Sequence, residues 1–288
     1  MNEERLQALL SVYRYRGAMP DFRAVVPIRR RSTWPWLAVA AAVVLIAIGA
    51  LMLRPRGNEW RITSGIPRQL RVGDVINREV RLQSRAVGVI DVAGGTTLRL
   101  IGKNRFALTS GTIHAKTTSP PGVFVVDTPR AQAVDLGCEY TLTVLPSGSG
   151  VLHVSSGWVE LGDGWMQSLV PQGAMATIGS DGRLSPPIFE DASPMFKEAM
   201  RRGDPRVALP LARRRDALTL LNLFRSTNEE ERVLIYDRLN ALVPAPPALT
   251  RDEVRHGNFL TVEAWWPDVL KASGVNALKK KKRMLPPT

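Results

Sequence analysis

The chain has 288 residues, a formal net charge of +13 and an isoelectric point near 10.6. Its length leaves room for one or two globular units. The single cysteine, Cys138, excludes an internal disulfide framework and a cysteine-based zinc site. Apart from a basic cluster at residues 279–283, the positive charge is spread along the chain, without an RNA-binding aromatic signature or zinc-finger spacing. We therefore expect no nucleic-acid partner.

Residues 1–33 contain one apolar stripe at helical spacing, with Asn2 as a candidate cap. The stripe consists of Leu6, Leu9, Leu10 and Tyr13. A short arm cannot bury such a stripe against itself. The arm is therefore expected to fray, to lie on the membrane, or to bind a partner protein through these four residues.

Residues 34–53 are predicted to form a membrane-spanning helix. Residues 37–53 are an unbroken apolar run, and a helix over residues 34–53 would span the hydrocarbon core of a bilayer, which is about 30 Å thick. Trp34 and Trp36 stand where an interfacial aromatic belt would form. The alternative is a cleaved secretory signal, with a cleavage site near Gly49. The apolar regions of such signals are shorter, about 7–15 residues.

The arginines next to the span favour an N-terminus in the cytoplasm. Residues 29–31 are three consecutive arginines directly before the span, whereas five arginines follow it more loosely, at positions 54, 56, 61, 68 and 71. Because basic residues are retained on the cytoplasmic side, the compact triplet favours a cytoplasmic arm. The bulk of the chain would then lie outside the cytoplasm.

The region after a connector at residues 54–69 is predicted to be all-β. In residues 139–144, Tyr140, Leu142 and Val144 alternate with threonines, and similar alternation occurs near residues 97–100 and 159–161. Glycine- and proline-containing turn signals separate the runs, at residues 94–95, 110–111, 120–122, 147–150 and 156–157. Short alternating runs with regular turns indicate a sandwich, barrel or short solenoid over residues 70–189.

Residues 125–140 (VVDTPRAQAVDLGCEY) resemble the central signature of FecR domains, the extracytoplasmic sensory domains of bacterial inner-membrane regulators. Flanking pieces at residues 111–114, 154–159 and 169–173 agree in order, so the resemblance covers roughly residues 72–180. The motif residues are Gly111, Thr128, Pro129, Ala131, Gly137, Cys138, Tyr140, Gly157 and Gly173.

The motif also carries local structural predictions. Proline lacks the donor that a central ladder needs, so Thr128 and Pro129 should end a strand. Gly137 should permit a bend before Tyr140 enters the core. Cys138 stands where the family commonly has threonine, and we expect a small buried side chain with an inert thiol.

Residues 190–288 are predicted to be α-helical with a basic tail. Helices are expected at 192–202 and 216–224, and two further helices should follow the capping signals at residues 227–230 and 250–253. Trp265 and Trp266 are expected in the core of this region, not in a ligand site.

The resemblance implies a regulator of the bacterial inner membrane that transmits an envelope signal through residues 1–33 to a cytoplasmic sigma factor. The sequence contains no catalytic or nucleotide-binding motif, and we expect no enzymatic activity, cofactor or metal. His114 and His153 fall on predicted strands, where a structural role is expected. Family members carry a multi-helix cytoplasmic domain, whereas only 33 residues precede the span here. The alternative is therefore a non-catalytic envelope-binding or scaffolding protein, which its anchor tethers near an unknown envelope partner.

Overall fold

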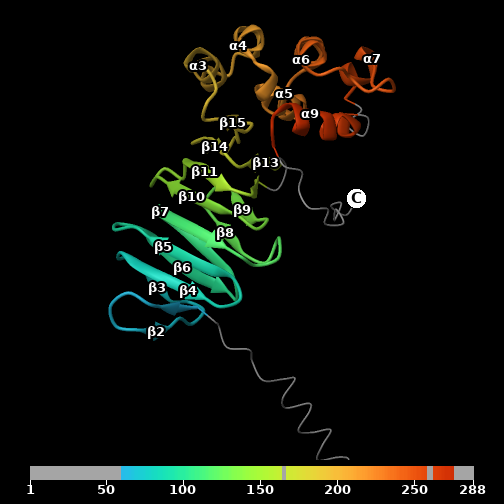
Figure 1. Ribbon diagram of the computed structural model, residues 1–288. Helices are drawn as coiled ribbons and strands as arrows, with labels where there is room; N and C mark the ends of the chain where they lie inside the picture. The colour runs from blue at the N-terminus through green and yellow to red at the C-terminus, as the bar shows by residue number, and fades with distance from the viewer. Residues whose placement is uncertain (1–59, 164–166, 258–261, 276–288) are drawn as a thin grey trace, which may run out of the picture. The chain divides into compact units, whose positions relative to one another are not determined.

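The computed structural model describes residues 60–163, 167–257 and 262–275 (Figure 1). The predicted span at residues 34–53, the basic cluster at 279–283 and the arm residues Leu6, Leu9, Leu10 and Tyr13 lie outside these ranges. Within the ranges, none of the helices has both the length and the apolar character needed to cross a membrane.

The described chain is mainly antiparallel β-sheet followed by helices, in agreement with the order of elements expected from the sequence. The strands form two sheets. In order across the sheet, sheet A consists of β2 (Arg68–Gln69), β1 (Arg61–Ile62), β4 (Val80–Ser84), β5 (Gly88–Val92), β7 (Arg105–Thr117), β10 (Glu139–Val144), β11 (Gly150–Ser156), β14 (Ala174–Ile178) and β15 (Ile188–Phe189). Sheet B consists of β3 (Val75–Ile76), β6 (Thr97–Gly102), β7, β8 (Val125–Asp127), β9 (Gln132–Asp135), β12 (Trp158–Gly162) and β13 (Gln167–Pro171). The β7–β8 pair is parallel, and the other pairs are antiparallel.

Strand β7 belongs to both sheets and joins them at Gly111. Its first half pairs with β6 and β8, and its second half with β5 and β10. Gly111 has φ +101°, and a Cβ atom there would lie 2.4 Å from Thr96 Cα. The prediction of a turn at residues 110–111 is therefore wrong, because the glycine redirects a continuous strand from one sheet into the other.

The two sheets enclose one hydrophobic core, as a sandwich does. Tyr140, Leu142 and Val144 are all buried, as their alternation with threonines predicted. An aromatic cluster fills the end near the start of the described chain, where Trp60 lies edge-on to Phe106 at a centroid distance of 5.2 Å and also contacts Phe124. Because Trp60 is fully buried and β1 and β2 pair with each other, residues 60–69 are part of the β domain. The prediction of a connector over residues 54–69 is therefore wrong for residues 60–69.

Helices and short 3₁₀ segments follow β15. These are α3 (Pro194–Arg202), α4 (Pro205–Leu211), η2 (Arg214–Asp216), α5 (Ala217–Leu223), η3 (Phe224–Ser226), α6 (Glu229–Leu242), α7 (Arg251–Arg255), η4 (Glu263–Trp265) and α9 (Trp266–Ala272). Trp265 is fully buried and packs against Tyr236, in agreement with the expected core position.

The start of α6 differs from the prediction by one residue. The capping box is formed by Asn228 and Glu231, not by Thr227 and Glu230. The Thr227 hydroxyl instead donates to the carbonyl oxygen of Leu223 at 3.0 Å, so it satisfies the end of α5. The predicted cap of α7 is confirmed, since the Thr250 side chain accepts a hydrogen bond from the Glu253 N–H.

Candidate functional site

The first part of the motif, residues 128–131, forms a tight turn between β8 and β9. The Thr128 N–H donates to the Ala131 carbonyl at 2.7 Å, and the Thr128 hydroxyl accepts from the Ala131 N–H at 2.9 Å. Strand β8 ends at Asp127, directly before Thr128 and Pro129, as expected. The motif threonine therefore closes a turn and is not available for chemistry.

The second part of the motif converges at one end of the sandwich. Gly137 and Gly157 both have positive φ, and a Cβ atom at Gly157 would lie 2.3 Å from the Gly137 carbonyl oxygen. The Gly157 carbonyl in turn accepts from the Gln172 N–H at 2.9 Å, beside Gly173. The structure thus brings Gly137, Gly157 and Gly173 together, while Gly111 and the turn at residues 128–131 lie elsewhere in the β domain.

A buried polar cluster lies beside these glycines. Asp135, which is 1% exposed, accepts hydrogen bonds from the Gly137 N–H at 2.5 Å and from the Cys138 thiol at 2.9 Å. Its Oδ2 atom and the hydroxyl of buried Tyr140 have no hydrogen-bond partner in the described part of the chain. Asp135 was not singled out from the sequence. Its inward orientation could have been inferred from its spacing of two residues from Ala133 on the same strand.

Burial dominates the electrostatics of this cluster. Desolvation raises the pKa of Asp135 despite the opposing hydrogen bond from Cys138. Desolvation also raises the pKa of the Cys138 thiol and of the Tyr140 hydroxyl, and the nearby Asp135 adds to both shifts. A thiol that stays protonated and is closed off from solvent is a poor nucleophile, so the expectation of an inert buried cysteine agrees with its surroundings.

Both strand histidines have partners on the outer face of sheet A. His114 Nδ1 lies 3.1 Å from the Thr141 hydroxyl, and His114 Nε2 lies 3.3 Å from Glu139. His153 pairs with Glu190 just after β15. Among the described residues, no group of three or more histidine, cysteine or acidic side chains is arranged to hold a metal ion.

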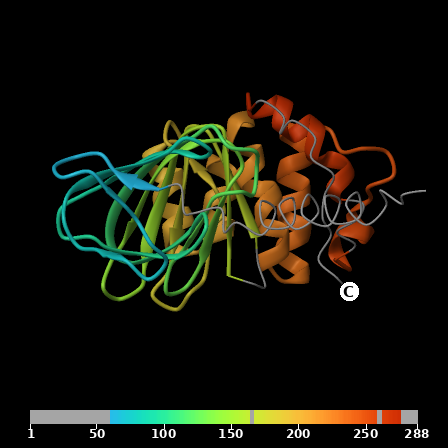
Figure 2. The ribbon, with the colours of Figure 1, turned by 90° about the horizontal axis from the view of Figure 1, so that it is seen from below.

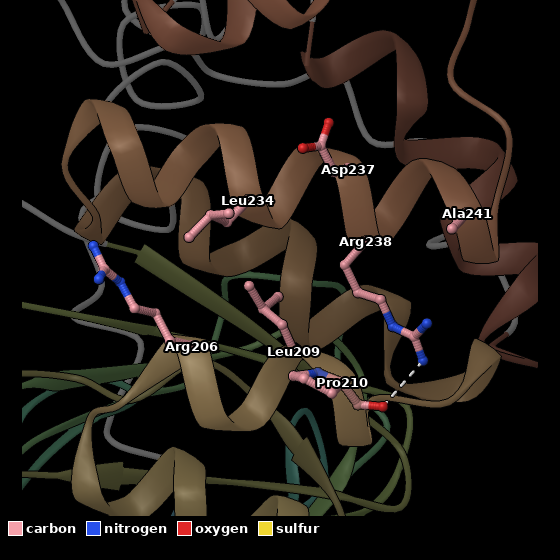
Figure 3. Close-up of a pocket in the computed structure, with 7 residues that line it drawn as sticks. All are labelled: Arg206, Leu209, Pro210, Leu234, Asp237, Arg238 and Ala241. Atoms are coloured by element: carbon pink, nitrogen blue, oxygen red, sulfur yellow. Dashed lines mark hydrogen bonds between the residues drawn. The ribbon is translucent and has the colours of Figure 1, made fainter.

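A groove of about 530 Å³ lies between α4 and α6 (Figure 3). Apolar side chains from both helices form its floor, and charged side chains form its rim. The lining residues are Arg206, Leu209, Pro210, Leu234, Asp237, Arg238 and Ala241. A second hollow of about 580 Å³ shares Arg206 and Leu234 with it. Leu234 is 39% exposed, so the groove presents one partly exposed apolar side chain between charged ones.

Arg238 fixes one wall of this groove. Its Nη2 atom donates to the carbonyl oxygens of Ala212 at 2.5 Å and of Pro210 at 3.4 Å, the second of which is the dashed line in Figure 3. These carbonyls lie at the end of α4, where intrahelical partners are missing and a cation is favoured. At the other end of the groove, Arg206 reaches Glu230 at 3.5 Å, and both side chains are exposed. The groove thus has one firmly held end and one loosely paired end.

Comparison with known proteins gave few matches. No protein-family model and no curated protein matches the chain. Two crystal structures of a Parabacteroides distasonis protein that is provisionally described as an anti-sigma factor are similar to it, each with 15% sequence identity and a TM-score of 0.31. The similarity covers 45% and 46% of this chain and 60% and 61% of the other. This chain therefore spans less than two thirds of the length of those structures.

Proposed function

We propose that this chain is a non-enzymatic regulatory protein of the bacterial inner membrane, anchored by residues 34–53, with its β domain outside the cytoplasm. The observation that carries the proposal is the FecR-like run at residues 125–140, which lies within a β domain of two sheets. In this proposal the β domain receives an envelope signal, and residues 1–33 pass it to a cytoplasmic sigma factor.

The use of the motif residues supports sensing or binding over catalysis. The threonine and glycines of the motif form turns and close backbone contacts. The buried carboxyl group of Asp135 and the thiol of Cys138 form a hydrogen bond with each other in the interior. A catalytic carboxyl or thiol needs access to a substrate. The motif offers no such access at Asp135 or Cys138, which are 1% and 3% exposed.

The proposed contact with the sigma factor is the apolar stripe of the arm. Leu6, Leu9, Leu10 and Tyr13 recur at the spacing of one helix face, which is the pattern of an amphipathic helix that binds a groove on a partner. No cofactor or metal takes part in this mechanism.

The second candidate is a non-catalytic envelope-binding or scaffolding protein. The net charge of +13 favours it, because a basic chain suits anionic lipid or envelope polymers. In this alternative the anchor holds the β domain at the membrane, and the arm has no partner of its own.

Reporter fusions test the topology on which both candidates depend. A reporter that is active only outside the cytoplasm should work when fused after Thr288, and a reporter that is active only in the cytoplasm should be silent there. The physical basis is retention of the arginine triplet on the cytoplasmic side. Activity of the cytoplasmic reporter at Thr288 would reverse the orientation and overturn the proposed sensory role of the β domain.

A further inference from the structure

We propose that the β domain itself binds anionic lipid through a surface at the end where the described chain enters it. This entry surface is formed by Arg71, Val72, Val75, Arg99, Ile101 and Lys103. It lies at the β2, β3 and β6 end of the domain in Figures 1 and 2. The inference deepens the proposed function and rests on it, because it adds a second membrane contact to the proposed anchor.

Backbone contacts place the parts of the entry surface side by side. Val75 and Arg99 are direct register partners on β3 and β6. The Gly73 N–H donates to the Leu100 carbonyl at 2.8 Å, which brings the turn containing Val72 alongside β6. The Leu70 N–H donates to the Trp60 carbonyl at 2.8 Å, so this turn also adjoins the point of chain entry.

Three apolar side chains of the entry surface are exposed, although clustered apolar side chains are normally buried in a folded domain. Val72 is 60% exposed, Val75 is 46% exposed and Ile101 is 39% exposed. Single exposed apolar residues are common, but a group on adjoining turns and strands indicates an interaction site. Valine and isoleucine tips between basic side chains fit the boundary between lipid headgroups and acyl chains.

The charge of the surface is complementary to anionic lipid. Residues 60–105 contain nine arginines and lysines but only three aspartates and glutamates. Asp74, which lies between Val72 and Val75 in the sequence, is already paired with Arg68 at 3.1 Å and accepts the Arg71 N–H. Arg71, Arg99 and Lys103 are exposed, and none of them forms an ion pair with another described residue. They are therefore free to meet lipid headgroups.

The short covalent connection to the proposed span favours the lipid bilayer as the binding partner of the entry surface. Residues 54–59 join the proposed span to Trp60, and six residues reach at most about 22 Å when fully extended. If residues 34–53 cross the membrane, the entry surface must stay within reach of the headgroups. A tethered basic surface meets lipid at a high effective concentration, so weak individual contacts suffice.

The test uses the full chain with Val72→Cys, labelled with an environment-sensitive fluorophore and reconstituted into lipid nanodiscs. The native Cys138 is buried, and a labelled chain without the substitution controls for its reaction. We expect a blue-shifted emission in discs with phosphatidylglycerol, little shift in pure phosphatidylcholine, and reversal by 0.5 M salt, at a Debye length of roughly 4 Å. Leu145→Cys, at a residue that is 53% exposed in the turn between β10 and β11 and is not part of the entry surface, should show no lipid-dependent shift.

A charge variant gives the expected size of the effect. Arg71→Gln, Arg99→Gln and Lys103→Gln together should lower the ratio of lipid-contacting to free domain on the order of a hundredfold, about fivefold for each charge. An unshifted Val72→Cys emission in anionic discs that retain the chain would overturn the inference. An equal shift on adding short duplex DNA without lipid would also overturn it, in favour of a nucleic-acid site.

The proposed anchor and the proposed entry surface can be tested separately. A chain that is washed out of the discs by alkaline carbonate would contradict the proposed span. The same labelled chain would then be mixed with anionic vesicles. A salt-sensitive blue shift there would still support the entry surface, and no shift would overturn it.

Discussion

The backbone of Gly157 lies against the carbonyl oxygen of Gly137, so close that a Cβ atom at Gly157 would be 2.3 Å from that oxygen. The contact joins the corner between β11 and β12 to the bend that precedes β10. It gives a physical reason why Gly157 must lack a side chain. At Gly137, 20 positions earlier, the positive φ of +88° is what favours glycine, because an added Cβ atom there would come no closer than 3.9 Å to Ser119.

Gly157→Ala should strongly destabilise the β domain. Positive φ alone costs an alanine about 1–2 kcal/mol, and forcing a methyl group into a close backbone contact adds about 1–3 kcal/mol. The matched control is Gly95→Ala, because Gly95 has a similar φ of +75° but nothing within 4 Å of an added Cβ atom. Thermal unfolding of both variants measures the difference. Equal losses of stability in the two variants would show that the close contact with Gly137 does not add to the cost of the Gly157 substitution.

Asp135→Asn should make the stability of the folded state depend less on rising pH. Because burial raises the pKa of Asp135, the folded state holds this proton to higher pH than the unfolded chain does. Below the ordinary aspartate pKa of about 3.9 both states are protonated, so the group has no effect. As pH rises from there through the raised folded pKa, the unfolded chain ionises first and the folded state loses stability.

The measurement for Asp135 is the unfolding temperature of the wild type and of Asp135→Asn between pH 4 and pH 8. Asparagine keeps an oxygen that can accept from the Gly137 N–H and the Cys138 thiol, but it cannot ionise. The stability of the wild type relative to the variant should therefore fall as pH rises. A relative stability that rises with pH would mean that the hydrogen bonds outweigh burial.

Arg238→Ala should loosen the wall of the α4–α6 groove. The guanidinium satisfies carbonyls at the end of α4, so its loss should cost about 1–3 kcal/mol and raise hydrogen exchange in α4. Arg206→Ala is the control, since its exposed pair with Glu230 should contribute at most about 1 kcal/mol. If amide hydrogen exchange in α4 is the same in both variants, the Arg238 hydrogen bonds do not stabilise this wall of the groove.

Much of the β domain could be predicted from local pattern, but its three-dimensional course could not. Alternation identified Tyr140, Leu142 and Val144 as core residues because side chains on a strand point to opposite faces in turn. It could not distinguish a strand break at Gly111 from a strand that crosses between sheets, because both use a glycine with positive φ. That choice depends on contacts between residues far apart in the sequence.

The helical region shows the same limit. Helix α4 was not anticipated because Pro205 and Pro210 lie within seven residues, and proline usually marks a helix end. Here Pro205 occupies the first turn, where proline is tolerated. The groove next to α4 also depends on α6, so no single sequence window contains its signal.

Leu9→Asp should abolish capture of the sigma factor by residues 1–33. An aspartate in the middle of the apolar stripe would have to be buried in the partner's groove without a counter-charge. The measurement is a pull-down with the arm as bait, with Gln7→Asp as the control off the stripe. Undiminished capture by the Leu9 variant would contradict the amphipathic mechanism.

The most direct test of regulation compares whole-cell transcripts of a strain that lacks residues 2–25 with a strain that lacks the whole chain. Immunoblotting first establishes that the shortened protein is present in the membrane at the normal level. If the arm carries the signal to a sigma factor, the shortened protein should reproduce the transcript changes of the complete deletion. Transcripts identical to those of the wild type would contradict the regulatory account and favour the scaffold.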